Sequence, residues 1–492
     1  MATAKLYFML VGTVQQVLLP WVLGLGTYGA LSRVLAFSAV VYNPIVTASI
    51  QGMSRAVAQA APNTEAAVIR RALRIHTGLA CLFGVLFVVL AGPICVLFNA
   101  PHVVTGLRIA ALVVFFYGLY APLIGVLNGR KKFVWQAGFD MVFGTLRTAL
   151  LALGGYLVGR SLGRGMEGAM AGFALAVALI ALGARWVVGS GRAGPGGLTS
   201  REHLAFMAPL LVGQTLLNLL LQADVSLLGA FASGAAMRAG LGPEAADPMV
   251  GAYRMTQLFS FLPYQLLISV TFILFPLLAQ AHHQGDREAV ARYVRTGVRI
   301  ALLVAGAMVS VTSGLAGPLF RLLFPPEAAD LGIRPMQLLT LGFGAFALFG
   351  IFTTVLNSLG REKASAVITA VAFFLVVGLC WFLLSAARFD RELLWKTAVS
   401  TSIGLGAATL AAGFLVQKTA RASVDLFSLL RVGLAMAIAI AVGRHLPYAG
   451  KLVAIGYALG IGLFYVLLLV VMRELGKADV ELVKQVLRRR AG

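Results

Sequence analysis

Long apolar stretches, separated by short polar turns, run through the whole chain. Each is about 20 residues long or longer, the length that a helix needs to cross the hydrocarbon core of a bilayer. The sequence therefore predicts an all-α polytopic membrane protein with fourteen spans. They lie at residues 6–25, 31–55, 76–98, 103–127, 133–158, 166–188, 204–232, 250–280, 298–323, 335–358, 364–386, 395–416, 426–444 and 451–472.

The composition agrees with this pattern. Hydrophobic residues make up 60% of the chain and charged residues 12%, and the mean hydropathy is +0.90. These values exclude a soluble globular protein. The net charge of +22 is a feature of many nucleic-acid-binding proteins. Membrane proteins, however, place an excess of Lys and Arg on their cytoplasmic loops, so we expect no nucleic-acid partner.

The distribution of basic residues predicts the topology. If the N-terminus is cytoplasmic, 26 of the 40 Lys and Arg residues fall in cytoplasmic loops or termini and 13 fall on the opposite side. Arg147 lies inside a span. The bias favours an even number of spans with both termini in the cytoplasm.

Short sequence matches recur in the same order in two halves of the chain. Leu-Ala-Gly-Pro at 90–93 recurs at 315–318, and Val-Leu-Asn at 126–128 recurs at 355–357. Six spans in each repeat give both repeats the same orientation. Parallel repeats predict a pseudo-two-fold axis along the membrane normal, with the binding site between the halves.

The repeat also predicts the domain organisation. The join between the halves, residues 189–203, contains Gly-Pro-Gly-Gly at 194–197, a composition typical of a flexible linker. The last two spans have no counterpart in the repeat and are interpreted as an addition. The predicted parts are an N-terminal six-helix lobe at 1–188, a cytoplasmic linker at 189–203, a C-terminal six-helix lobe at 204–416, two extra helices at 417–472 and a cytoplasmic tail at 473–492.

Two proline-interrupted spans each begin near an arginine. Arg33 and Arg254 are 221 positions apart, and Gln257 follows Arg254 on the same helical face. A full charge near hydrocarbon costs about 2.5–3.5 kcal/mol, so it usually faces a protein interior or a wet cavity. We predict that both arginines line one cavity and bind an anion. The alternative is that both side chains extend from the outer ends of their spans to lipid headgroups.

Further polar residues fall on single helical faces. Gln214, Asn218 and Gln222 are spaced i, i+4, i+8 and predict a cavity wall that binds substrate, or else hydrogen bonds between helices. Asp224 lies just beyond this stripe and is a candidate ion-coupling carboxylate.

The span at 133–158 carries a second candidate pair. Asp140 and Arg147 are seven residues apart, roughly 10 Å along a helix. Arg147 is a candidate substrate ligand, and Asp140 is a second candidate for ion coupling. A structural ion pair with a neighbouring helix is the alternative.

Motifs of soluble enzymes are absent from the sequence. It has no Gly-rich phosphate loop with a lysine, no metal-spaced His or Cys set and no nucleophile with a base. We therefore expect no enzyme, no metal site and no cofactor. Coupling of transport to an Na⁺ or H⁺ gradient stays open.

The chain resembles the multidrug/oligosaccharidyl-lipid/polysaccharide (MOP) exporter superfamily in three features. These are the span count, the repeats with two added spans, and Phe-Pro-Leu-Leu-Ala-Gln at 275–280 followed by Gly285-Asp286. The resemblance implies two lobes in a V, a cationic central cavity and alternating access. Fourteen-span members look like flippases for undecaprenyl-pyrophosphate-linked saccharides.

For this chain the resemblance implies a flippase in the bacterial inner membrane. It would move lipid-linked oligosaccharide from the cytoplasmic to the outer leaflet for polysaccharide assembly. Its partners would be the lipid-linked saccharide and membrane lipids, and it would act as a monomer near polysaccharide-assembly proteins. The alternatives are a lipid II flippase of peptidoglycan synthesis and a cation-coupled multidrug antiporter of the same superfamily.

Overall fold

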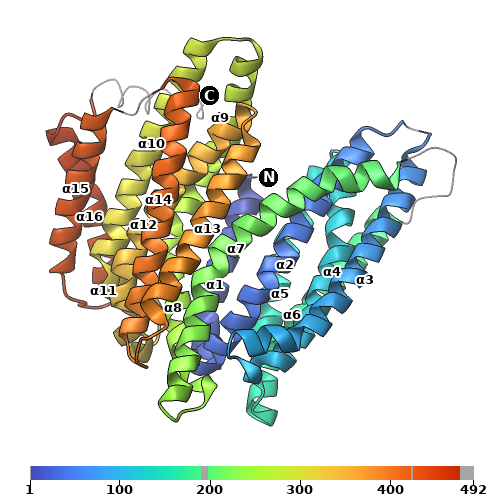
Figure 1. Cartoon of the computed structure of the whole chain (residues 1–492), viewed down its shortest axis with the longest axis horizontal. Coiled ribbons are helices and arrows are strands. Elements are labelled where there is room, and N and C mark those ends of the chain that lie inside the picture. Colours follow the sequence, from blue (N-terminus) through green and yellow to red (C-terminus); the bar gives the residue numbers. More distant parts are fainter. Residues whose placement is uncertain (1, 62, 190–197, 423–424, 477–492) are drawn as a thin grey trace. The chain divides into compact units, whose positions relative to one another are not determined.

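The computed structural model describes residues 2–61, 63–189, 198–422 and 425–476, which form helices joined by turns, with no strand (Figure 1). The α-helices are α1 Ala2–Leu23, α2 Leu25–Ala58, α3 Glu65–Leu97, α4 Val104–Gly129, α5 Phe133–Leu162, α6 Gly165–Val188, α7 Ser200–Arg238, α8 Asp247–Ser260, α9 Leu262–His283, α10 Arg287–Gly314, α11 Ala316–Leu323, α12 Pro326–Ser358, α13 Glu362–Leu384, α14 Glu392–Ala420, α15 Leu426–Arg444 and α16 Lys451–Val471. Two short 3₁₀ helices, η1 Pro101–Val103 and η2 Pro243–Ala246, precede α4 and α8.

The predicted spans correspond to these helices, except that the spans at 250–280 and 298–323 each cover parts of two helices. Within 298–323, α10 ends at Gly314 and α11 begins at Ala316. Among the described residues, 13 helices are long and apolar enough to cross a membrane, and the apolar part of α1, Tyr7–Leu23, is a shorter helix. The predicted span at 250–280 is two helices, because α8 ends at Ser260 and α9 begins at Leu262. Pro263 stands in the first turn of α9, where its missing N–H costs nothing and its ring disfavours a continuous helix. The all-α polytopic fold is confirmed.

The chain divides into two compact units. Unit 1 comprises Met1–Met255 and Cys380–Thr397, and unit 2 comprises Thr256–Leu379 and Ala398–Gly492. The predicted lobes were defined by the sequence repeat, whereas these units are defined by compactness. The lobe limits therefore stay a prediction.

In unit 1, α4 is the central helix. It packs against α2, α3 and α6, and α2 also packs against α7, while α5 packs against α6 and α1. Many of the side chains of α4 are buried, whereas α3 presents Leu82, Val85 and Val89 on its outer face. A helix buried on all sides with apolar neighbours around it is typical of the centre of a membrane bundle.

Glycines allow α5 and α6 to cross closely. A Cβ on Gly172 would lie 1.9 Å from the carbonyl oxygen of Leu150, and one on Gly168 would lie 2.3 Å from the carbonyl oxygen of Gly154. Small residues four apart let two backbones approach within van der Waals contact, which drives helix association where lipid removes the hydrophobic effect. The α5–α6 contact therefore depends on these glycines.

Unit 2 is built around α10. This helix packs against α9, α12, α15 and α16. Rings from α9 and α12 pair as Tyr264–Phe346, with centroids 4.8 Å apart. The two added spans, α15 and α16, are fastened to α10 by polar contacts. The Tyr465 hydroxyl donates to the Leu303 carbonyl at 3.2 Å, and buried Glu474 lies 3.2 Å from Arg299 and 3.6 Å from Arg431.

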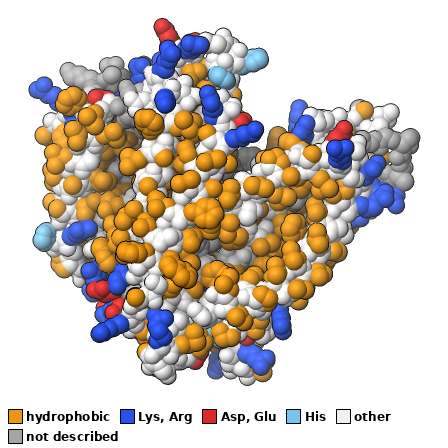
Figure 2. Space-filling model, in the orientation of Figure 1, with side chains coloured by type: hydrophobic (Ala, Val, Ile, Leu, Met, Phe, Trp, Pro, Cys, Tyr) orange, Lys and Arg blue, Asp and Glu red, His pale blue; other side chains and the backbone are white. Residues whose placement is uncertain are grey.

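Exposed apolar side chains cover much of the visible face of each unit, and Lys and Arg gather toward the ends of the helices (Figure 2). On α16 alone, Leu452, Leu459 and Leu463 are each more than 70% exposed. Soluble monomers rarely expose apolar surface on this scale, whereas a surface in contact with lipid requires it. The protein is a multi-pass membrane protein.

We predict that Gly172→Val destabilises the protein, because the added carbons must displace the Leu150 backbone. Overpacking of this kind typically costs about 1–3 kcal/mol. Thermal unfolding of the purified protein in detergent measures it. Gly138→Val on α5 is the matched control, because a Cβ there meets nothing within 4 Å. Equal melting temperatures for the two variants would contradict the close crossing.

Candidate functional site

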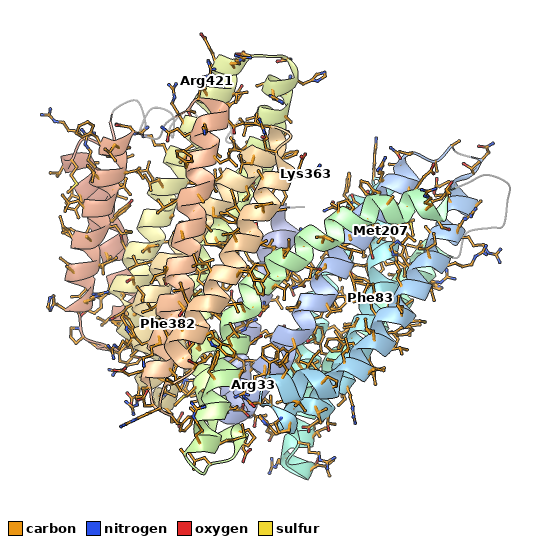
Figure 3. All side chains as sticks on the ribbon, viewed as in Figure 1. Arg33, Phe83, Met207, Lys363, Phe382 and Arg421 are labelled. Atoms are coloured by element: carbon orange, nitrogen blue, oxygen red, sulfur yellow. The ribbon has the colours of Figure 1, made fainter. Side chains whose placement is uncertain are left out.

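Arg33 on α2 lies inside unit 1, where its side chain is 1% exposed (Figure 3). Its Nε is 2.9 Å from Oδ1 of Asp247, the first residue of α8. Its Nη1 donates to Oγ of Ser233 on α7 at 2.9 Å. The arginine thus joins three helices, and a carboxylate compensates its charge. Pairing is what makes a buried charge tolerable at low dielectric.

Two more groups complete this cluster. The Nε2 atom of His102 lies 3.0 Å from Oδ2 of Asp247, and Ser233 Oγ donates to the Pro243 carbonyl at 2.8 Å. The Arg33–Asp247 approach is close enough for an ion pair but is not aligned as a hydrogen bond. Within the described residues, Arg33 Nη2 is buried without a hydrogen-bond acceptor. The cluster therefore holds its charges in balance and keeps one donor edge unused.

Glycines make the room that the ion pair needs. A Cβ on Gly229 of α7 would lie 3.2 Å from Arg33 Nε, and one on Gly29 would lie 1.8 Å from the Asp247 carbonyl oxygen. A Cβ on Gly251 would lie 2.7 Å from the Leu25 carbonyl oxygen. The start of α8 therefore packs directly on the backbone of α2. This close approach brings Asp247 within reach of Arg33.

Arg254, the counterpart of Arg33 in the sequence, lies in a different environment. It is partly exposed, and its Nη1 donates to Oε1 of Gln222 on α7 at 3.3 Å. Gln257 follows on the same helix, falls in unit 2 and is 1% exposed. The structure thus brings Arg254 together with one predicted wall residue. The role of both arginines as anion ligands stays a prediction.

The polar stripe of α7 contacts neighbouring helices. Asn43 on α2 donates through Nδ2 to Oδ1 of Asn218 at 2.8 Å, and Asn218 Nδ2 donates to the Gln214 carbonyl at 2.8 Å. Asp224 is 1% exposed and accepts from the Tyr253 hydroxyl at 3.0 Å and from its neighbour's backbone N–H at 2.8 Å. Hydrogen bonds between helices therefore occupy part of this stripe.

Arg147 stands midway along α5 and is partly buried. Its Nε donates to Oε1 of Gln15 on α1 at 2.9 Å. The rings of Phe8, Phe143 and Phe173 lie 5.5, 5.8 and 5.9 Å from its guanidinium carbon. Asp140 is two turns away on α5 and is also partly buried. In the described part of the chain no ion pair joins Arg147 to a carboxylate, and the contacts named above are to an amide and to phenyl rings.

Part of the chain matches a family model, and its structure is similar to those of known transporters. Residues 209–382 match the MatE family model. The structure is similar to that of the lipid II flippase MurJ in an inward closed conformation, with a TM-score of 0.77 and 13% identity over 96% of this chain and 98% of that one. The chain has the fold of the MOP exporters.

Two further solved structures carry the same fold. A multidrug resistance MATE family transporter of the MOP superfamily, in an inward-facing conformation, matches with a TM-score of 0.65 and 15% identity over 88% of this chain and 96% of that one. A MOP superfamily transporter from Pyrococcus furiosus matches with a TM-score of 0.57 and 16% identity over 88% and 95%. No curated protein sequence matches the chain. The resemblance inferred from the sequence is confirmed, and the matched proteins are transporters rather than enzymes.

Sequence reasoning missed several polar residues in this MOP fold. It found neither the partners of Arg33, which are Asp247, Ser233 and His102, nor a second buried pair. Nε2 of His76 on α3 lies 3.1 Å from Nε2 of His203 on α7, and both rings are buried. Phe83 and Met207 lie on the same two helices and line a small cavity with His76 (Figure 3). A hydrogen bond of this kind requires one ring to be neutral at Nε2 and to accept.

We predict that Asp247→Asn lowers stability strongly, because it leaves the Arg33 guanidinium buried without a counter-charge. Breaking a buried pair by removing one partner typically costs about 3–5 kcal/mol. The measurement is the melting temperature in detergent.

Two controls separate this effect from general damage. Asp330→Asn alters an exposed carboxylate and should leave the melting temperature unchanged. The double variant Arg33→Gln/Asp247→Asn removes both charges and should recover part of the loss. A single Asp247→Asn variant as stable as the unaltered protein would show that the pair is not stabilised as described.

Proposed function

We propose that this protein is a flippase for undecaprenyl-pyrophosphate-linked oligosaccharide units. It moves them from the cytoplasmic to the outer leaflet of the bacterial inner membrane for polysaccharide assembly, by alternating access. Its N- and C-termini lie in the cytoplasm, consistent with the 26-to-13 distribution of basic residues. The MOP fold supports the transport mechanism, and the structural similarity to a lipid II flippase supports a lipid-linked substrate.

The observation that carries the proposal is an arginine midway along a span that forms no ion pair within the described residues. Arg147 contacts the Gln15 amide and three phenyl rings. A cation at the middle of a membrane span is costly, and the cost falls when an anion binds beside it. A pyrophosphate group supplies about two negative charges, and a guanidinium can bind it through two parallel hydrogen bonds. Arg147 is therefore arranged to interact with an anion during its passage.

Other polar residues are further proposed substrate ligands. Arg254 with Gln222, and Gln214 with Asn218, supply a second cation and amide groups suited to phosphate and sugar hydroxyls. Gln257 continues the same helical face as Arg254. Arg33 is a further proposed ligand. Asp247 already balances its charge, so it would bind the substrate through Nη2, which has no hydrogen-bond acceptor within the described residues.

The two added helices favour a lipid-linked substrate over a small cation. The drug-transporting branch usually has twelve spans, whereas α15 and α16 are built onto α10 here. Their fastening through Tyr465 and Glu474 makes them an integral part of unit 2. Additional helices beside the bundle provide apolar surface along which a long hydrocarbon chain can lie.

We predict that Arg147→Ala abolishes transport and that Arg147→Lys restores only part of it. Lysine keeps the positive charge but lacks the planar fork that binds phosphate through two hydrogen bonds. Arg254→Ala and Arg254→Lys should follow the same order. The measurement is protein-dependent movement of a lipid-linked pyrophosphate oligosaccharide between the leaflets of proteoliposomes.

Arg160→Ala is the matched control. Arg160 lies on the same helix, near its end, is exposed and bonds only Tyr156 within the described residues. Its removal should leave transport intact. If Arg147→Ala is folded and transports as well as Arg160→Ala, the anion-binding role of Arg147 is wrong.

Lipid II is the alternative substrate within the flippase class. It carries the same lipid pyrophosphate, so the Arg147 variants do not separate the two substrates. Complementation does: a lipid II flippase supports growth of bacteria depleted of their own, whereas a polysaccharide flippase supports only polysaccharide export.

A cation-coupled antiporter is the second candidate function, and Asp224 is the observation that favours it. Its carboxylate is buried and accepts the Tyr253 hydroxyl, and a buried carboxylate inside a membrane protein is the kind of group that carries a proton or Na⁺. If this function holds, Asp224→Asn removes gradient-driven efflux of a cationic dye, and Asp140→Asn tests the other candidate carboxylate. Absence of any dye efflux by the unaltered protein would exclude this function.

A further inference from the structure

A groove of about 910 Å³ lies on unit 1, between α3 and α6. Both helices pack against α4, which forms the floor. The groove is lined by Arg70, Leu73, Arg74 and Thr77 on α3, by Phe116, Leu119 and Leu123 on α4, and by Ala178, Ala181, Leu182 and Arg185 on α6.

Three arginines give this groove a strong positive charge. Arg70 and Arg74 are one turn apart on α3, and Arg185 is in the last turn of α6. In the described part of the chain none of the three side chains has a hydrogen bond or an ion pair, and no Asp or Glu lines the groove. Like charges one helical turn apart are unfavourable. An anion that bridges them converts this repulsion into attraction.

The rest of the groove is apolar. Phe116, Leu119 and Leu123 form its floor, and Leu182 on its wall is 68% exposed. Trp186, which follows Arg185, is 88% exposed. Trp and Arg gather where a membrane helix passes from hydrocarbon to headgroups. The arginines therefore lie at the headgroup level, with the apolar floor beside the acyl chains.

The length of the groove indicates the size of its occupant. Arg70 and Thr77 are seven residues apart on α3, as are Ala178 and Arg185 on α6, which is roughly 10 Å along each helix. This distance accommodates a phosphate headgroup and the first methylene groups of an acyl chain.

We propose that this groove binds one anionic glycerophospholipid of the surrounding bilayer. Its phosphate lies among Arg70, Arg74 and Arg185, and the start of an acyl chain lies on Phe116 and Leu119. Basic pockets between membrane helices bind anionic headgroups in this way. The bound lipid links α3 to α6 across α4. None of the residues proposed for the substrate path lines this groove, so the proposal holds whether or not the proposed substrate is correct.

Unit 2 offers a comparison groove of about 1350 Å³. It is also basic and includes Arg287, Arg292 and Arg295, but two acidic residues, Asp286 and Glu288, lie among them. Five of its 17 lining residues are apolar, against seven of 11 in the groove of unit 1. The two grooves therefore differ in their apolar lining, which a phospholipid needs for its acyl chain and a simple anion does not.

Native mass spectrometry of the full chain tests the proposal. The protein is titrated with phosphatidylglycerol, and in parallel with phosphatidylcholine. We expect one tightly held phosphatidylglycerol and no phosphatidylcholine site of similar affinity. Arg70→Gln/Arg74→Gln/Arg185→Gln should weaken that site by roughly a hundredfold, at about 1 kcal/mol for each basic residue near a headgroup. These residues are exposed, so the variant should stay folded, and its melting temperature without lipid checks this.

The matched control is Arg287→Gln/Arg292→Gln/Arg295→Gln, which removes the same charge from unit 2 and should leave the tight site intact. A second control, Leu119→Gln/Leu182→Gln, keeps the arginines and should also weaken the site. Equal losses in the two arginine variants would overturn the proposal in favour of unspecific attraction. Preferential binding of a polyprenyl pyrophosphate at Arg70 and Arg74 would overturn it in favour of a substrate site.

Discussion

Charge inside a hydrocarbon layer must be compensated, and the arginines of this protein meet that requirement in three ways. Arg33 is paired with Asp247 and joins α2, α7 and α8. Arg147 donates to an amide and lies beside phenyl rings, and no ion pair to it is formed within the described residues. The arginines around Arg74 sit at the end of an apolar groove. The first arginine therefore supports the fold, and we propose that the second favours a passing anion and the third group a lipid headgroup.

The joint between α2, α7 and α8 shows how packing and charge depend on each other. Gly29 and Gly251 let the start of α8 lie on the α2 backbone, and that contact delivers Asp247 to Arg33. Asn43 and Asn218 connect α2 to α7 further along. Polar contacts of this kind define one arrangement of helices more sharply than apolar packing does, since lipid competes well for apolar surface.

Hydropathy alone predicted the spans, because the length of a membrane helix is a local property of the sequence. The position of Arg147 within its span followed in the same way. The partner of Arg33 did not, because Asp247 follows a Pro-containing turn and was expected in a loop outside the membrane. His76 and His203 were also missed, since they meet only through the packing of two helices 127 positions apart. The partner of a buried charge depends on how helices cross. The hydropathy pattern along the sequence does not show how they cross.

The central claim is that this MOP fold carries a pyrophosphate-linked lipid, and its most direct test is transport by the unaltered protein. Proteoliposomes are loaded with a lipid-linked pyrophosphate oligosaccharide in one leaflet, and its arrival in the other leaflet is followed with an enzyme or lectin that cannot cross the membrane. We expect arrival that depends on the protein and is blocked by excess lipid pyrophosphate without sugar. Efflux of a cationic dye by the same proteoliposomes, without movement of the lipid-linked saccharide, would contradict it.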